Sequence, residues 1–154
     1  IREGDPLEIY TDREGEVILK KYSMIGDIGQ FAKQYADALS QTTGYLVIVT
    51  DRDMVIAASS GVKKDMVGKH ISRELEKAAL DRKIILTDSS KKEFCRVADD
   101  MEGDYIEAIA PIICNGDVAG SIVFLNKNTE RKFGETEQKM IAVAASFLGK
   151  QMEG

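Results

Sequence analysis

Residues 105–126 read YIEAIAPIICNGDVAGSIVFLN, the clearest structural pattern in the chain. Two apolar runs, 105–114 and 118–126, flank the tripeptide Asn-Gly-Asp at 115–117. Asn and Gly readily adopt the positive φ angles that a tight turn between antiparallel strands needs. The stretch therefore predicts a long β-hairpin.

Further strands are expected between residues 45 and 97, N-terminal to this hairpin. Residues 45–50 (YLVIVT) are almost continuously apolar, which is typical of a strand buried on both faces. Residues 51–53 predict a tight turn into residues 54–58, which would run antiparallel to the first strand. Short strands are expected at 84–87 and 94–97.

Three helices are expected around this sheet. Ser23 is a suitable cap for a helix whose apolar residues recur every three or four positions, and Gly44 would end it. Ser72 is a suitable cap for a second helix that reaches about Arg82. The third, at 135–152, is acidic in its first turn and apolar over more than one face, so it needs burial on two sides.

This order of elements predicts an α+β fold in which the terminal helices pack on one face of an antiparallel sheet. A small-molecule pocket is expected over the opposite face, beneath the irregular segment 59–104. Arg96 is slightly favoured among the candidates there, because a guanidinium group can bind a carboxylate or phosphate. The polar residues expected at the pocket are Asp51, Arg52, Ser59, Ser60, His70, Arg96, Asp104 and Tyr105.

The first residues predict a second, smaller hairpin. Apolar and polar residues alternate from Leu7 to Thr11, a polar turn follows at 12–15, and another β-rich run extends from Val17 to about Tyr22. A two-stranded hairpin is only marginally stable alone. We therefore expect it to pair with another chain.

Surplus apolar surface predicts self-association, at least as a dimer. The apolar stripe on the helix from 25 to 39 favours a partner helix, although packing on its own sheet is the open alternative. The residues expected at the oligomer interface are Leu7, Ile9, Val17, Leu19, Ile25, Ile28, Ala32, Tyr35, Leu39, Met140, Ala144, Phe147, Leu148 and Met152.

Composition excludes several other classes of protein. The 154 residues suffice for one ordinary domain and a small appendage, and no apolar run is long enough for a membrane span or an export signal. Cys95 and Cys114 are far apart in sequence and His70 is the only histidine, so no zinc site or disulfide framework is expected. We expect structural thiols, no metal, no cofactor and no catalytic residues.

Two segments carry a family resemblance. Residues 1–10 and 16–22 closely resemble the second half of AbrB-type domains, which are swapped-hairpin DNA-binding dimers. The remainder resembles the GAF-containing sporulation regulators in which such a domain precedes a GAF domain. The motifs that carry this second resemblance are 31–33 (FAK), 35–39 (YADAL), 63–65 (KKD), 111–112 (PI), 115–117 (NGD), 147–148 (FL) and 151–153 (QME).

The resemblance implies a cytoplasmic regulator of forespore genes that binds DNA and assembles as a tetramer. Residues 1–23 would be the C-terminal half of the AbrB-like domain, and residues 24–154 the GAF-like regulatory and oligomerisation domain, with 24–42 as the linking helix. Because the chain starts at Ile1 in a polar segment, we expect further residues upstream. Activation and repression are both open.

DNA binding is not expected from the visible chain itself. In the AbrB-like family the DNA-contacting arginines belong mainly to the first half of the domain, which would precede Ile1. The first 24 residues hold four basic and six acidic side chains, and the whole chain has a net charge of −5. Phosphate contacts require clustered positive charge. DNA is therefore expected as a partner of the complete N-terminal domain.

The GAF resemblance leaves the ligand open, because these domains bind cyclic nucleotides, tetrapyrroles, amino acids or nothing. The residues after Asn126-Lys127 depart from the pattern of cyclic-nucleotide GAF domains. One alternative is a ligand-free spacer that only oligomerises. A remote alternative is a GAF-type methionine sulfoxide reductase with a cysteine nucleophile, disfavoured because the chain lacks the tryptophan typical of that pocket.

Overall fold

The computed structural model describes residues 13–153, and of residues 13–27 only the backbone. The chain folds as α+β, with consecutive strands grouped between the helices. The elements are α1 (Arg13–Thr43), β1 (Leu46–Asp51), β2 (Val55–Ala58), the short 3-10 helix η1 (Lys64–Met66), α2 (Arg73–Leu80), β3 (Ile85–Asp88), β4 (Ile106–Cys114), β5 (Asp117–Asn126) and α3 (Glu135–Glu153).

The strands of the described residues form one antiparallel sheet in the order β2-β1-β5-β4-β3. The expected hairpin is confirmed as β4 and β5, joined by a turn in which Asn115 has φ 53° and Gly116 has φ 84°. β1 pairs with β5 from Leu46, opposite Leu125, to Asp51, opposite Gly120. The sheet is therefore assembled around contacts between segments far apart in sequence.

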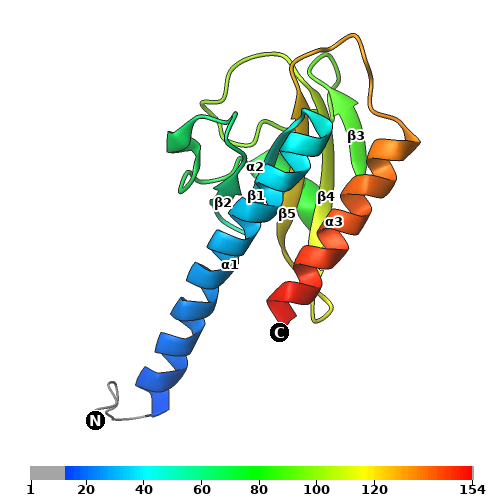
Figure 1. Ribbon diagram of the computed structural model, residues 1–154. Coiled ribbons are helices and arrows are strands. Elements are labelled where there is room, and N and C mark those ends of the chain that lie inside the picture. Colours follow the sequence, from blue (N-terminus) through cyan, green and yellow to red (C-terminus); the bar gives the residue numbers. More distant parts are fainter. Residues whose placement is uncertain (1–12, 154) are drawn as a thin grey trace.

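α1 and α3 lie on one face of the sheet, as expected, and α2 lies on the other (Figure 1). Successive strand side chains point to opposite faces, so both faces carry a hydrophobic core. On the α1 and α3 face, Val47, Ile122 and Phe124 pack against Ala36 and Ile141. On the α2 face, the core includes Ile48, Leu75, Val97, Ile109 and Leu125.

α1 corrects the expected start of the first helix. We expected a strand from Val17 to about Tyr22, but the chain is helical from Arg13 onward. A helix satisfies its backbone hydrogen bonds within its own segment, whereas a strand needs another strand beside it, and none of the five described strands lies there. The expected strand at 7–11 lies outside the described residues. The expected end is confirmed, since Gly44 has φ 81°.

The strand expected at 94–97 is also wrong, because this segment is a loop. Its backbone groups find partners outside the sheet. The Cys95 N–H donates to Glu107 Oε1 at 2.9 Å, and the Val97 carbonyl accepts from the Ser72 N–H at 2.9 Å. Ser72 also caps α2 as expected, with its Oγ accepting from the Leu75 N–H at 3.1 Å. Side chains and a helix cap thus replace a neighbouring strand.

The close approach of α3 to β4 generates a stability prediction. Gly149→Ala should lower the free energy of unfolding by about 2 kcal/mol, because the new methyl group would lie 2.2 Å from the Ile113 carbonyl oxygen. Urea unfolding measures the change.

Gly29→Ala is the matched control, a second helical glycine whose added Cβ would lie 3.9 Å from the Ile56 carbonyl oxygen. This variant should be about 0.5 kcal/mol more stable than the wild type, since alanine favours helix. Equal unfolding midpoints for the two variants would contradict the close contact between α3 and β4.

Candidate ligand pocket

A cavity of about 220 Å³ opens on the α2 face of the sheet, where a pocket was expected. Leu46 and Ile48 of β1 and Leu125 of β5 line its sheet side. Two loop segments, at 61–66 and 100–105, supply the other lining residues near the sheet. Ligand pockets usually measure about 300 to 1,000 Å³. This cavity therefore suits a small ligand.

Charged side chains of both signs surround this apolar floor. Lys69 forms an ion pair with Asp100 and lies 3.7 Å from Asp65, and all three line the cavity. The hydrogen bond that Lys69 donates to Asp100 raises the pKa of Lys69. Lys63 and Lys127 also line the cavity. The Lys69–Asp100 pair ties the 100–105 segment to a residue three positions after the 61–66 segment.

Tyr105 is the one residue of the eight expected at the pocket that lines this cavity. Two others, Ser59 and Ser60, come immediately before the lining segment 61–66 in the sequence. Ser59 is buried and its Oγ accepts a hydrogen bond from the Val47 N–H at 3.0 Å. Ser60 is exposed and its N–H donates to Asp37 of α1 at 2.9 Å.

The other five have local roles or are exposed. The Asp51 carboxylate stabilises the β1–β2 turn by accepting the N–H groups of residues 53 and 54, each at 2.7 Å. Arg52 in that turn and His70 are exposed, as is Asp104. Arg96 donates to the Met101 carbonyl oxygen and lies over the Phe94 ring at 6.0 Å, so its guanidinium does not line the pocket.

Sequence reasoning missed most of the lining because it searched for polar groups at strand ends. The apolar floor was visible as alternation within β1 and β5, where Leu46, Ile48 and Leu125 share one face. Met66 and Met101 could also have been recognised, because each is an apolar residue within an otherwise polar loop; both are buried in the structure. A search for apolar residues in the irregular segment would have located both walls.

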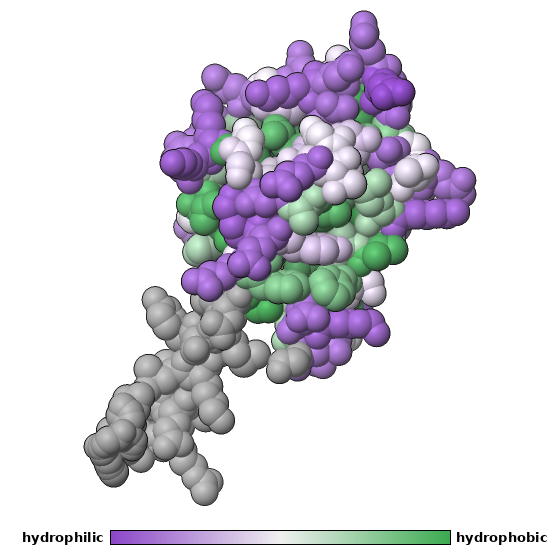
Figure 2. All heavy atoms as spheres, in the orientation of Figure 1, coloured by the Kyte–Doolittle hydropathy of each residue, from purple (hydrophilic) through white to green (hydrophobic). Residues whose placement is uncertain are grey.

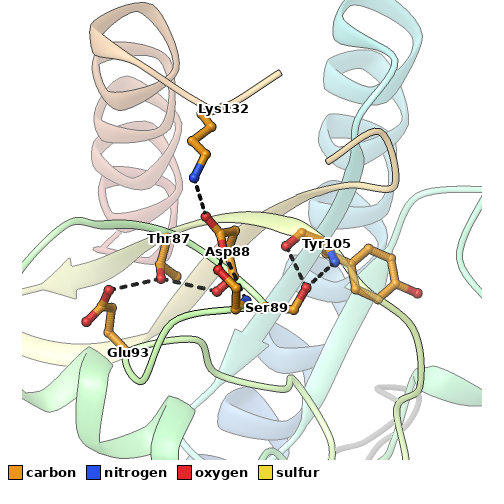
Figure 3. Close-up of polar contacts among 7 residues, drawn as sticks. Thr87, Asp88, Ser89, Glu93, Tyr105 and Lys132 are labelled. Atoms are coloured by element: carbon orange, nitrogen blue, oxygen red, sulfur yellow. Dashed lines mark hydrogen bonds and ion pairs between the residues drawn. The ribbon is translucent and has the colours of Figure 1, made fainter. Parts of the chain in front are cut away.

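A polar network links the Tyr105 side of the pocket to the segment before α3 (Figure 3). The Tyr105 N–H donates to Ser89 Oγ at 2.8 Å, and the Ser89 N–H donates to the Tyr105 carbonyl at 3.0 Å. The neighbouring Asp88 accepts from Lys132 Nζ at 2.9 Å and from Ser90. Hydrogen bonds from Ser90 and Lys132 hold the pKa of Asp88 well below its usual range.

Glu107 is a fully buried carboxylic acid on the α2 face of β4. Burial raises the pKa of Glu107 to about 8, although the hydrogen bond from Cys95 N–H opposes the shift. Its Oε2 has no hydrogen-bond partner among residues 13–153. Glu107 therefore carries a proton at neutral pH.

Neither cysteine has the properties of a nucleophile. Burial and the nearby carboxylates of Glu107 and Glu74 raise the pKa of Cys95 to about 12, so its thiol stays protonated. Cys95 contacts Glu107, whereas Cys114 is at the other end of β4. Seven strand residues span about 23 Å, too far for a pair of reacting thiols.

A second surface lies on the opposite side of the molecule, where Figure 2 shows hydrophobic side chains exposed over the α1 and α3 face. Val143 is 65% exposed and Phe147 is 40% exposed. The Phe147 ring lies 5.7 Å from that of Phe31 and 5.2 Å from that of Tyr35. This cluster joins the two helices and leaves apolar area uncovered.

The structure corrects part of the expected interface. Ala32, Ala144 and Leu148 are buried in the chain's own core and have almost no surface for a partner. Ile28 and Tyr35 are half-buried, and Leu39, Met140 and Met152 pack at the edge of the core. Leu7 and Ile9, and the side chains of Val17, Leu19 and Ile25, lie outside what the structure describes.

The described residues show neither a metal site nor a membrane span. No group of three or more His, Cys, Asp or Glu side chains between residues 13 and 153 is placed to hold a metal ion. None of the helices in this range is long and apolar enough to cross a membrane.

The sheet order, the terminal helices on one face and α2 on the other define a GAF-type fold. The GAF domain of an Acinetobacter phosphoenolpyruvate-protein phosphotransferase has a TM-score of 0.66 at 11% identity, over 93% of this chain and 94% of that one. A type II free methionine-R-sulfoxide reductase from Thermoplasma acidophilum has a TM-score of 0.62 at 11% identity, over 84% of this chain and 94% of that one. These likenesses concern the fold alone.

The chain belongs to the family of stage V sporulation protein T C-terminal domains, described as transcription factors, which it matches over residues 27–153. It is also 46% identical to "Stage V sporulation protein T" of Bacillus subtilis (strain 168), over 99% of this chain and 84% of that protein. The expected resemblance to sporulation transcription regulators with a GAF domain is thereby confirmed.

The buried acid predicts a pH-dependent stability. The folded chain holds a proton on Glu107 up to a pKa of about 8, whereas the unfolded chain releases it near 4.5. The stabilisation is complete below the unfolded pKa and is lost as pH rises through about 8. Glu107→Gln, neutral at every pH, should flatten the dependence of unfolding free energy on pH and be more stable than the wild type at high pH.

Urea unfolding from about pH 5 to pH 9 measures this dependence. Glu135→Gln is the control, because Glu135 is exposed on α3 and the substitution should leave the wild-type dependence intact. A Glu107→Gln curve that runs parallel to that of the wild type would show that Glu107 is ionised in the folded protein.

Proposed function

We propose that this chain is the effector-sensing and dimerising part of a sporulation transcription regulator. A small molecule binds in the pocket on the α2 face, a second copy packs against α1 and α3, and α1 carries the change toward the DNA-binding residues. The observation that carries the proposal is the separation of an enclosed pocket and an exposed apolar surface onto opposite faces of one sheet. A ligand in the pocket and a partner subunit on the apolar surface would therefore bind to opposite faces of the sheet.

The lining of the pocket indicates the class of effector. Its floor is apolar, from Leu46, Ile48 and Leu125, and Lys69 and Asp100 provide both signs of charge beside it. A ligand with a small apolar body and a charged or zwitterionic end matches this distribution. Large planar cofactors do not fit a volume of about 220 Å³.

DNA binding belongs to the part of the regulator that is N-terminal to the GAF-like domain, while residues 24–154 sense and dimerise. The regulator works in the forespore cytoplasm, where the promoters of the genes it regulates lie. Family membership supports transcription regulation, and the buried, protonated Cys95 supports a non-enzymatic role despite the fold shared with a sulfoxide reductase. The alternative is a ligand-free spacer that only oligomerises, and a ligand screen distinguishes it from an effector-binding domain.

Blocking the pocket should abolish ligand stabilisation. Thermal-shift screening against amino acids and nucleotides should identify a compound that adds about 2.7 kcal/mol at 100 times its dissociation constant. Val62→Trp, which adds a large ring to the half-buried pocket wall, should remove that stabilisation.

Val67→Trp is the matched control, since Val67 is 48% exposed outside the cavity, and it should retain ligand stabilisation. A screen in which no compound stabilises the wild type would favour the spacer. A compound that stabilises wild type and Val62→Trp equally would place the ligand elsewhere.

An added charge on the exposed apolar surface should weaken the dimer. Val143→Glu puts a carboxylate where the partner helix would pack, and the loss should be tenfold or more in the dimer association constant. Sedimentation equilibrium measures this constant.

Gln138→Glu adds the same charge to α3 from an exposed position outside the aromatic cluster, and should leave the association constant unchanged. A monomeric wild type, or equal association of both variants, would contradict dimerisation through this surface.

A further inference from the structure

We propose that the hydrogen-bonded pair Asp37 and Ser60 is the joint through which the pocket wall acts on α1. The inference rests on the proposed function, because it explains how occupancy of the pocket reaches the helix that leads to the N-terminal segment. It concerns one contact between a helix and a loop that are 23 residues apart in sequence.

On the pocket side, Ser60 directly precedes the residues that line the cavity. Gly61, Val62 and Lys63 all face it. Ser59 anchors the same segment to β1, since its N–H donates to the Val47 carbonyl at 2.8 Å and its own carbonyl accepts from the Val62 N–H at 2.9 Å. A displacement of Val62 is therefore carried directly to Ser60.

On the helix side, Asp37 accepts both polar hydrogens of Ser60. Its Oδ1 receives the Ser60 N–H at 2.9 Å and the Ser60 Oγ–H at 3.0 Å. Lys33, one turn earlier in α1, donates to the Ala58 carbonyl at 3.1 Å and forms an ion pair with Asp37 at 3.2 Å. Two successive turns of α1 thus bind one short segment of the pocket wall.

The charge at this joint is fixed in the neutral pH range. Burial alone would raise the pKa of Asp37, but hydrogen bonds from Ser60 and Lys33 lower it by more, so its pKa lies below the usual value. Asp37 remains a carboxylate, and hydrogen bonds to charged groups are stronger than those between neutral groups.

The opposite wall of the pocket leads elsewhere. Tyr105 is tied to Ser89, and the adjacent Asp88 is tied to Lys132, in the segment between β5 and α3 (Figure 3). The two walls therefore contact different helices or their flanking segments. Asp37 provides two of the hydrogen bonds that connect Ser60, and with it the 61–63 wall, to α1, and Lys33 Nζ donates a longer third one to Ser60 Oγ at 3.5 Å.

Amide hydrogen exchange of the full chain, followed by NMR, tests the joint without any ligand. Asp37→Ala should raise exchange of the hydrogen-bonded Ser60 and Val62 amides about tenfold, because it removes two hydrogen bonds to a carboxylate. Asp37→Asn keeps an acceptor at Oδ1 and should restore most of the protection. Gln34→Ala, at an exposed position of α1, is the control and should leave these amides unchanged.

Coupling must also run in the reverse direction. Val62→Ala, a truncation of the pocket wall, should raise exchange of the α1 amides at 36–41 about threefold in the wild-type background and have little further effect on them in the Asp37→Ala background. Equal effects in both backgrounds, or no effect on α1 in either, would overturn the joint. Because these measurements need no effector, failure here is distinct from failure to find a ligand or a dimer.

Discussion

A sheet that is apolar on both faces imposes the main constraint on this molecule. β1, β4 and β5 place side chains alternately into two cores, so each face must be covered by other parts of the same chain. α1 and α3 cover one face with regular helices, and Gly149 allows α3 to lie directly on the β4 backbone. The other face receives only α2 and loops, which cover it incompletely. The pocket is the part of that face left open.

The two faces consequently differ in what they offer to other molecules. Regular helices pack closely and present an outward surface, where Val143 and Phe147 remain exposed. Loops leave an enclosed space lined by Leu46, Ile48 and charged residues, which a small molecule fits better than a protein surface does. Sensing and association can therefore be separated within one domain without competing for the same residues.

The sequence predicted the elements that have strong local signals and failed where partners decide the structure. The 105–126 hairpin, the central strand and the α2 cap at Ser72 follow from periodicity, turn residues and capping, and all are present. The expected strand at 94–97 was wrong because the hydrogen-bond partners of that segment are the Glu107 side chain and the cap of α2, which no local pattern reveals. The strand expected from Val17 was wrong for a similar reason.

The pocket shows the same limit. Its location was predictable from the order of elements, whereas its lining depends on which loop residues meet across the cavity, such as Lys69 and Asp100. Arg96 looked suited to a ligand in sequence, but its guanidinium satisfies a backbone carbonyl instead. The chemical type of a side chain therefore identified candidate ligand-binding residues, but not the groups that each side chain contacts in the fold.

α1 is continuous from Arg13 to Thr43, and its first turns project beyond the sheet (Figure 1). At 1.5 Å per residue, the part between Asp37 and Arg13 is about 36 Å long. A tilt of about 5° at its inner end would move its outer end by about 3 Å. This is close to the rise of about 3.3 Å per residue along a β-strand. Mechanical amplification of this kind needs no large rearrangement inside the domain.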